Sequence, residues 1–275
     1  MGRPTRQDRT DLLQQAIAAQ QRGDAVAAIA ALDRLLEQDA GDAEALHMRG
    51  VLSLQQGDAA AAALFLHRAV GQRAGPQAQV NLGIALAAAG KAVEAEAVLR
   101  RAVAEPDVPP QAAYNLGHLL AARGAAEEAG TWLRAALAAA PGYTRASCEL
   151  AALLLDESRT EEARSVALEA LGHAPGHPVA LFHLGLAERA QGRHGEAVAS
   201  LRRAHAGLGP QRDLMLGLGA SLQETGALDD ALEVYREILA AHPDAYGAVL
   251  RALASASRGC FDLRPSRLRA LLVVA

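Results

Sequence analysis

Apolar residues follow a helical spacing over short segments, and small or polar residues interrupt these segments at regular points. Over residues 77–89 the apolar residues, which include Val80, Leu82, Ile84, Ala85 and Leu86, fit a helical spacing, and Gly90 then breaks the run. The next run, over residues 93–103, has apolar residues at i, i+3, i+4 and i+7: Ala95, Val98, Leu99 and Ala102. One apolar face at this spacing is typical of an amphipathic helix. The pattern therefore predicts a hairpin of two helices, with glycine closing the first helix in the left-handed conformation.

The residue at this hairpin turn returns at a nearly constant interval along the chain. The steps are 34, 33, 34, 34, 34 and 34 residues, and the residues are Gly23, Gly57, Gly90, Gly124, Ser158, Gly192 and Gly226. Five residues after each comes an alanine: Ala28, Ala62, Ala95, Ala129, Ala163, Ala197 and Ala231. Seven residues before each comes another small residue: Ala16, Gly50, Gly83, Gly117, Ala151, Gly185 and Gly219. We call these two sets the small-residue positions, and we expect the paired helices to approach closely there.

A period of this length predicts a solenoid, in which each hairpin buries its apolar face only against its neighbours. The 34-residue period, the alanine of each repeat and the intermittent closing prolines Pro141, Pro175 and Pro243 resemble the tetratricopeptide repeat. Residues 114–142 and 181–204 are the closest copies. The resemblance implies an all-α fold, a right-handed superhelix of about seven 34-residue helix-turn-helix repeats with a C-terminal capping helix.

The expected organisation has three parts. Residues 1–8 are an N-terminal tail, and residues 246–275 hold a partial eighth repeat, with its opening helix over about 246–258, and the capping helix. The seven repeats fill residues 9–245 and begin near residues 9, 43, 76, 110, 144, 178 and 212.

Composition and charge narrow the classes of function. The formal net charge is −4 with charges of both signs interspersed, whereas nucleic-acid binding favours a clustered positive face. No apolar run reaches the roughly 18–20 residues that span a bilayer, and the polar first ten residues do not resemble a signal peptide. Cys148 and Cys260 lie in different repeats, so both are expected as free thiols in a cytoplasmic protein. Only Lys91 among the 27 basic residues is lysine, which suggests a bacterial genome rich in GC pairs.

No residue pattern predicts catalysis, a metal site or a cofactor. His173 and His177 are four residues apart, but Pro175 and Gly176 between them predict a connection rather than one helix face. Acidic pairs such as Glu127 and Glu128 begin second helices, where negative charge suits the helix dipole. We therefore expect a protein that is not an enzyme.

The resemblance also implies which positions form a concave binding groove. In that family the first helix of each hairpin lines the groove. The candidate peptide-binding residues are Val80, Asn81, Ile84, Tyr114, Asn115, His118, Arg145, Phe182 and His183. The corresponding positions in repeats five to seven also include Cys148, Glu149, Asp156, Val179, Leu186, Arg189, Asp213, Leu216, Gln223 and Glu224.

Asn81 and Asn115 occupy the same position of consecutive repeats, each in an Asn-Leu-Gly triplet. An asparagine side chain offers both a donor and an acceptor, so it can bind a peptide backbone. The alternative is that both belong to the repeat consensus and contact no ligand. Tyr114 and Phe182 are likewise either walls of side-chain pockets or packing residues between neighbouring first helices.

Two functions remain open. The leading one is a scaffold or adaptor that binds a peptide segment or helix of a partner protein in its groove. The alternative is the N-terminal substrate-recruiting arm of a bacterial enzyme, of the glycosyltransferase, sulfotransferase or hydroxylase type. The C-terminal helix expected after Pro265 either caps the solenoid, packs against another copy to make a homodimer, or leads into a further domain.

Overall fold

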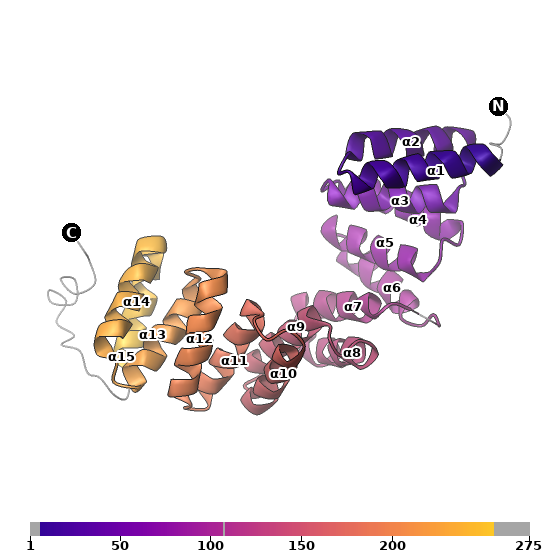
Figure 1. Ribbon diagram of the computed structural model, residues 1–275. Coiled ribbons are helices and arrows are strands. Elements are labelled where there is room, and N and C mark those ends of the chain that lie inside the picture. Colours follow the sequence, from indigo (N-terminus) through magenta and orange to yellow (C-terminus); the bar gives the residue numbers. More distant parts are fainter. Residues whose placement is uncertain (1–5, 107, 256–275) are drawn as a thin grey trace. The chain divides into compact units, whose positions relative to one another are not determined.

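The computed structural model describes residues 6–106 and 108–255, and these form helices joined by short turns (Figure 1). The chain divides into two compact units, residues 1–139 and 140–275, which we call unit 1 and unit 2. The helices of unit 1 are α1 (Arg6–Gln21), α2 (Ala25–Gln38), α3 (Ala43–Gln55), α4 (Ala59–Gly71), α5 (Pro76–Ala88), α6 (Ala92–Ala102), α7 (Pro110–Ala122) and α8 (Ala126–Ala139). The helices of unit 2 are α9 (Thr144–Asp156), α10 (Thr160–His173), α11 (Pro178–Ala190), α12 (His194–Leu208), α13 (Arg212–Glu224), α14 (Leu228–Ala241), the 3-10 helix η1 (Pro243–Ala245) and α15 (Tyr246–Ser255).

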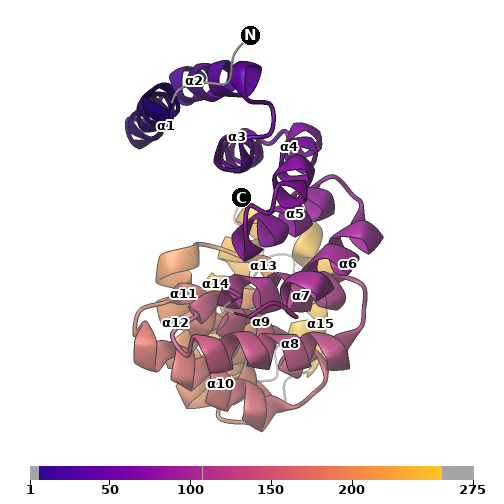
Figure 2. The same cartoon turned by 90° about the vertical axis from the view of Figure 1, so that its right-hand side faces the viewer.

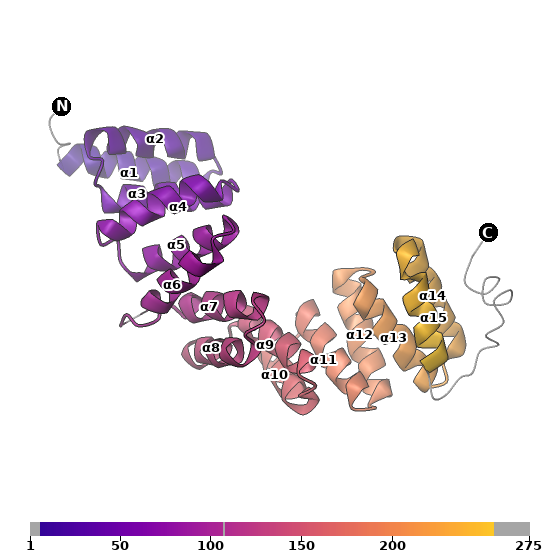
Figure 3. The same ribbon diagram turned by 180° about the vertical axis from the view of Figure 1, so that it is seen from behind.

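Within each unit every helix packs against the next one along the chain, as α1 and α2 show most plainly (Figures 2 and 3). The odd-numbered helices are the first helices of the hairpins, and they also contact one another. In unit 1 the contacts join α3 with α5 and α5 with α7; in unit 2 they join α9, α11, α13 and α15 in succession. Each unit is thus an α-solenoid in which the first helices share one surface.

The turns between paired helices adopt the predicted left-handed conformation. The six glycines have φ between 74° and 83°, from Gly192 to Gly226. Ser158, which stands where the period places a glycine, has φ 61°. Because a side chain disfavours this conformation, the turn at Ser158 before α10 is more strained than the six turns that have glycine.

The small-residue positions lie where the prediction puts them, at the helix crossings. All seven alanines, from Ala28 to Ala231, have zero exposure. A Cβ placed on Gly83 would lie 2.5 Å from the Cγ of Leu99, and one on Gly185 would lie 2.6 Å from the Cγ of Leu201. The prediction of close helix approach is confirmed.

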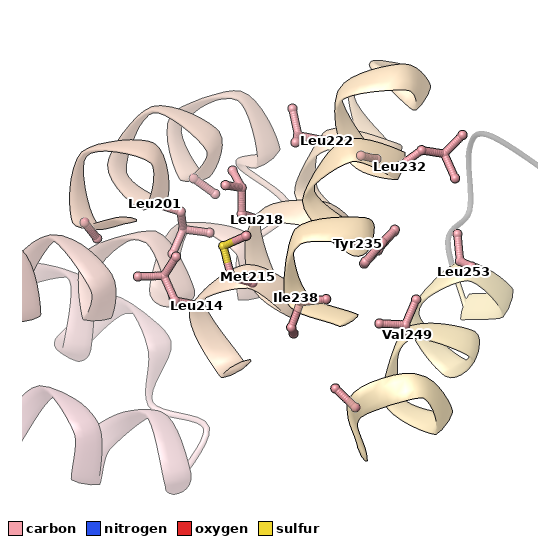
Figure 4. Close-up of a cluster of buried hydrophobic side chains, with 14 of the residues drawn as sticks. Leu201, Leu214, Met215, Leu218, Leu222, Leu232, Tyr235, Ile238, Val249 and Leu253 are labelled. Carbon is pink, nitrogen blue, oxygen red and sulfur yellow. The ribbon is translucent and has the colours of Figure 1, made fainter. Parts of the chain in front are cut away.

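The second helices complete the core. In unit 2 the largest cluster joins α12, α13, α14 and α15 around the fully buried Tyr235 (Figure 4). Its hydroxyl donates to the Oε1 of buried Gln223 over 2.6 Å, so the buried polar group has its partner.

Some of the segments predicted from the sequence lie at or beyond the ends of the residues that the structure describes. α1 begins at Arg6, inside the stretch expected as a tail, and α15 covers part of the expected opening helix over 246–258. Cys260 and the expected capping helix after Pro265 lie outside the described residues. No described helix has the length and apolar character that crossing a membrane requires.

Candidate functional site: the surface of the first helices

The sixth residue of each repeat forms a row across the first helices, which we call the central row. Its members are Gln14, Met48, Asn81 and Asn115 in unit 1 and Glu149, His183, Gly217 and Arg251 in unit 2. The side chains of this row differ from repeat to repeat.

In unit 1 the amide of Asn81 is held by its neighbours. Its Nδ2 lies 2.9 Å from Nε2 of His47 in the preceding repeat, and its Oδ1 accepts a hydrogen bond from Gln77 Nε2 over 3.1 Å. With Asn81 as the donor, His47 accepts through Nε2 and is neutral. Burial lowers the pKa of His47, against the charge of Glu44, which agrees with this neutral state.

Asn115 makes a different bond. Its Nδ2 donates to the main-chain oxygen of Gln111 on its own helix over 2.7 Å. Asn81 therefore links two repeats, whereas Asn115 is bound within one. Each side chain is half-buried and retains a further N–H for an outside acceptor.

The apolar candidates of unit 1 are less accessible than expected. Val80 is completely buried against Ala102 and Ala112, so the expected contact between Val80 and a partner is wrong. The reason is that Val80 packs between its own repeat and the next. Ile84 is half-buried against the same cluster. Tyr114 is only 7% exposed, and its ring stacks on the exposed His118 at 6.1 Å between ring centroids.

In unit 2 the first helices line a cavity of about 580 Å³ that is open to solvent. Every lining residue comes from α9, α11, α13 or α15: Ala152, Leu155, Asp156, Phe182, His183, Leu186, Arg189, Asp213, Leu216, Gly217, Ala220, Ala248, Arg251 and Ala252. Of the nine candidate peptide-binding residues, Phe182 and His183 line this cavity. Arg145 is exposed on α9 and does not line it.

Gly217 is buried at the lining of this cavity, and the candidate set missed it. It is the only glycine of the central row, between His183 and Arg251. A Cβ on Gly217 would lie 3.2 Å from Leu186 Cδ2 and 3.5 Å from Leu201 Cδ1, so these leucines pack where a side chain would begin. The glycine in the row was visible in the sequence, but its contact with Leu186 depends on how the repeats stack.

Charged side chains of both signs surround the cavity. Asp156, Arg189, Asp213 and Arg251 are all exposed, and none makes an ion pair with another described residue. Burial, with the charge of His177 adding to it, lowers the pKa of His183 to about 4. His183 is therefore neutral at neutral pH, and its buried Nδ1 has no hydrogen-bond partner among the described residues.

Comparison with known proteins agrees with this repeat architecture. The tetratricopeptide repeat model matches residues 13–79, 80–144 and 148–213, and a second model of the same repeat matches residues 188–255. The chain belongs to the tetratricopeptide repeat family. Members typically act as protein-interaction scaffolds without catalysis of their own, and solenoids of this kind bind through extended surfaces. No curated protein matches the sequence.

Solved structures with tetratricopeptide repeats share the fold at low sequence identity. PilW, a widely conserved type IV pilus biogenesis factor, is 20% identical with a TM-score of 0.65, over 74% of this chain and 94% of PilW. The C-terminal part of a repeat protein from Cytophaga hutchinsonii is 14% identical with a TM-score of 0.67, over 88% of this chain and 99% of that one. YrrB, described as having an unusual peptide-binding site, is 20% identical with a TM-score of 0.54, over 66% of this chain and 94% of YrrB.

His173, His177 and Cys148, which could in principle react or bind a metal, lie at helix ends or in the core. His173 ends α10 and His177 caps α11, so the prediction that they share no helix face is confirmed. Cys148 is a free thiol, as expected, and burial raises its pKa to about 11, which keeps it protonated at neutral pH. Across the described ranges, no group of three or more His, Cys, Asp or Glu side chains is arranged to hold a metal ion.

Proposed function

We propose that this tetratricopeptide repeat protein is a non-enzymatic adaptor that binds a segment of a partner protein on its first helices. The observation that carries the proposal is the cavity of unit 2, because every side chain lining it belongs to a first helix. Four charged groups beside it have no ion-pair partner among the described residues, so they remain available to a ligand. A surface that combines an apolar cavity with charged side chains that make no ion pair among the described residues is suited to bind a protein segment.

Unit 1 contributes to the same function in a different way. Asn81 and Asn115 each retain an N–H, so both amides can donate to the backbone of an extended segment. YrrB, which is similar in fold, carries a peptide-binding site by its description. The resemblance supports a peptide as the kind of ligand, and the amides of unit 1 are suited to it.

The test is capture of partners by the full chain. The tagged protein is expected to co-purify the same partners from its native cells when it carries Arg134→Ala, a change on the second helix α8. Replacing Arg189 and Asp213 together by alanine is expected to reduce that recovery strongly, because both residues line the cavity. Equal recovery by the wild type and the double variant, measured by quantitative mass spectrometry, would contradict the proposal.

Association of two copies through the C-terminal segment stays a prediction, as does the cytoplasmic location. Light scattering on the chain with and without residues 260–275 tests the association. A full chain that is a dimer and becomes a monomer on truncation supports the association. If both forms are monomers, the adaptor binds only other proteins.

A further inference from the structure

The outward face of the second helices in unit 1 is a second surface, which the adaptor function does not use. We infer that two copies of the chain associate through this face, with α4 of one copy lying antiparallel on α4 of the other at a two-fold axis near Leu64. The inference goes beyond the proposed function. It follows from the exposure, the apolar character and the order of charges of the residues on this face.

Each second helix turns three residues away from the core, four residues apart and so on one side of the helix. They are the residues three, seven and eleven positions after the residue at the hairpin turn, and we call each set of three an outer stripe. The outer stripes of α2, α4 and α6 are Val26, Ala30 and Arg34; Ala60, Leu64 and Arg68; and Val93, Ala97 and Arg101. All of these residues are exposed, so the face is accessible to another molecule.

The bulky aliphatic residues of these stripes have most of their surface in water. The exposed fraction is 78% for Val26, 60% for Leu64 and 75% for Val93. They lie on three consecutive second helices, and the other positions in the apolar part of the stripes hold alanine. Apolar surface repeated over neighbouring helices is favourably buried in an interface.

Charges of opposite sign lie at the two ends of the three helices. The acidic row, at the N-terminal ends, consists of Asp24, Asp58 and Glu94. The two aspartates cap their helices, and Glu94 pairs with Lys91 over 3.5 Å. The arginine row, at the C-terminal ends, consists of the last residues of the stripes. None of these arginines makes an ion pair with another described residue.

This order of charges makes the face complementary to itself. The hairpins stack in chain order, so α4 lies between α2 and α6 (Figures 1 and 3), and equivalent helices of successive repeats run in the same direction. A two-fold rotation about an axis through Leu64 places α4 on α4 of the second copy and α2 on its α6, in opposite directions. Each arginine row then lies over the acidic row of the other copy. Such a dimer uses one surface twice, as most homodimers do.

The same charges disfavour a membrane as the occupant. An anionic lipid surface would attract the arginine row, but it would also meet the acidic row at the other ends of the same helices. Only a surface with the opposite order of charges matches both rows, and a second copy turned by the two-fold axis provides that order.

Unit 2 lacks this complementarity. The outer stripes of α10, α12 and α14 are Glu161, Ser165 and Glu169; Gly195, Ala199 and Arg203; and Asp229, Glu233 and Glu237. Two of these three stripes are acidic at both ends, so a two-fold rotation would bring like charges together. The association therefore belongs to unit 1.

The first experiment measures the mass of the full chain by sedimentation equilibrium over a range of concentrations. The wild type is expected to dimerise reversibly. Leu64→Glu places two like charges at the axis and is expected to raise the dissociation constant about 10-fold or more. Leu168→Glu is the matched control, because Leu168 is an exposed leucine on the second helix α10 of unit 2, and it is expected to dimerise as the wild type does. A monomeric wild type, or equal constants in the two variants, would overturn the inference.

Truncation separates this dimer from one formed through the C-terminal segment. The chain without residues 260–275 is expected to remain a dimer, with the same sensitivity to Leu64→Glu. A dimer that truncation abolishes and Leu64→Glu leaves unchanged would overturn the inference.

A cysteine at the axis tests the geometry directly. In a chain that carries Cys260→Ser, Leu64→Cys is expected to give a disulfide-linked dimer under mild oxidation, because a residue at a two-fold axis meets its own equivalent. The bond requires Cα atoms within about 7 Å of each other. Leu168→Cys is the control and is expected to stay unlinked, and Cys148 is buried. A dimer that Leu64→Cys fails to link would overturn the placement of the axis.

The remaining measurements distinguish other occupants of the face. Vesicles of phosphatidylcholine and phosphatidylglycerol are expected not to bind the wild type; vesicle binding by a monomeric chain, lost in Leu64→Glu, would assign the face to a membrane and overturn the inference. Leu64→Glu is expected to capture cellular partners as the wild type does, because α4 contributes no residue to the cavity of unit 2. Loss of partners in this variant of a monomeric chain would assign the face to another protein instead. The adaptor function is thus tested independently of the dimer.

Discussion

The first helices of the two units are built alike, yet their central rows differ in what they leave open. In unit 1, Asn81 bonds to His47 and Gln77, and Asn115 bonds to its own helix. In unit 2, Gly217 carries no side chain and Arg251 makes no ion pair with a described residue. The two units therefore share the scaffold and differ in the side chains that their first helices present.

The largest expected effect concerns what the units share. Gly83→Leu in unit 1 and Gly185→Leu in unit 2 are each expected to lower the free energy of unfolding by about 3 kcal/mol, because both overpack a helix crossing. Urea unfolding followed by circular dichroism measures the effect on the chain, and fluorescence of Trp132, the single tryptophan, reports on unit 1.

Two further variants control this comparison. Ala163→Leu, at a completely buried alanine, is expected to cost about 1–3 kcal/mol. Gly195→Ala, where a Cβ meets no atom within 4 Å, is expected to be close to neutral. A small loss in one unit only would show that the helix crossings of the two units are not equivalent.

The next effect is the dependence of stability on pH that His183 gives to unit 2. The pKa of His183 is about 4 in the folded chain against 6.5 ordinarily, so the unfolded chain binds more protons between these values. The stability from this group is fully present above about pH 6.5 and is lost as pH falls towards 4, by at most about 3 kcal/mol. Urea unfolding at several pH values measures the loss.

His183→Gln is the matched variant, because it retains a polar side chain without a titrating ring. It is expected to flatten the dependence between pH 6.5 and 4. The same slope in the variant and the wild type would mean that other groups, such as His47 in unit 1, account for it.

A smaller effect tests the one turn that lacks glycine. Ser158→Gly in unit 2 is expected to stabilise the chain by about 1 kcal/mol, because serine at φ 61° is strained and glycine is not. Gly192→Ala, at φ 74°, is expected to destabilise it by a similar amount, about 1 kcal/mol. Thermal melts give both values, and a Ser158→Gly variant that is less stable would contradict the account of the turn.

These comparisons also mark what could be predicted from the sequence. The turn at Ser158 and the buried Ala163 follow from the period, since the local backbone and the crossing of two paired helices constrain these positions. The burial of Val80 and the bond between Asn81 and His47 depend on how successive repeats stack, which the period does not specify. The cavity of unit 2 also depends on this stacking, because its lining residues come from four different first helices.

The last effect, on binding and not on stability, decides what the asparagines of unit 1 do. Asn81→Ala together with Asn115→Ala removes hydrogen bonds worth about 1 kcal/mol each, so a partner held by these amides is expected to bind roughly five-fold more weakly per bond. Titration of a captured partner measures this, with Arg134→Ala as the variant expected to have no effect. Because Asn81 bonds to His47, the variant also loses a contact between repeats, and His47→Gln is the control for that loss. Unchanged affinity in the folded double variant would leave both asparagines as repeat consensus, and the proposed binding would then rest on the cavity of unit 2.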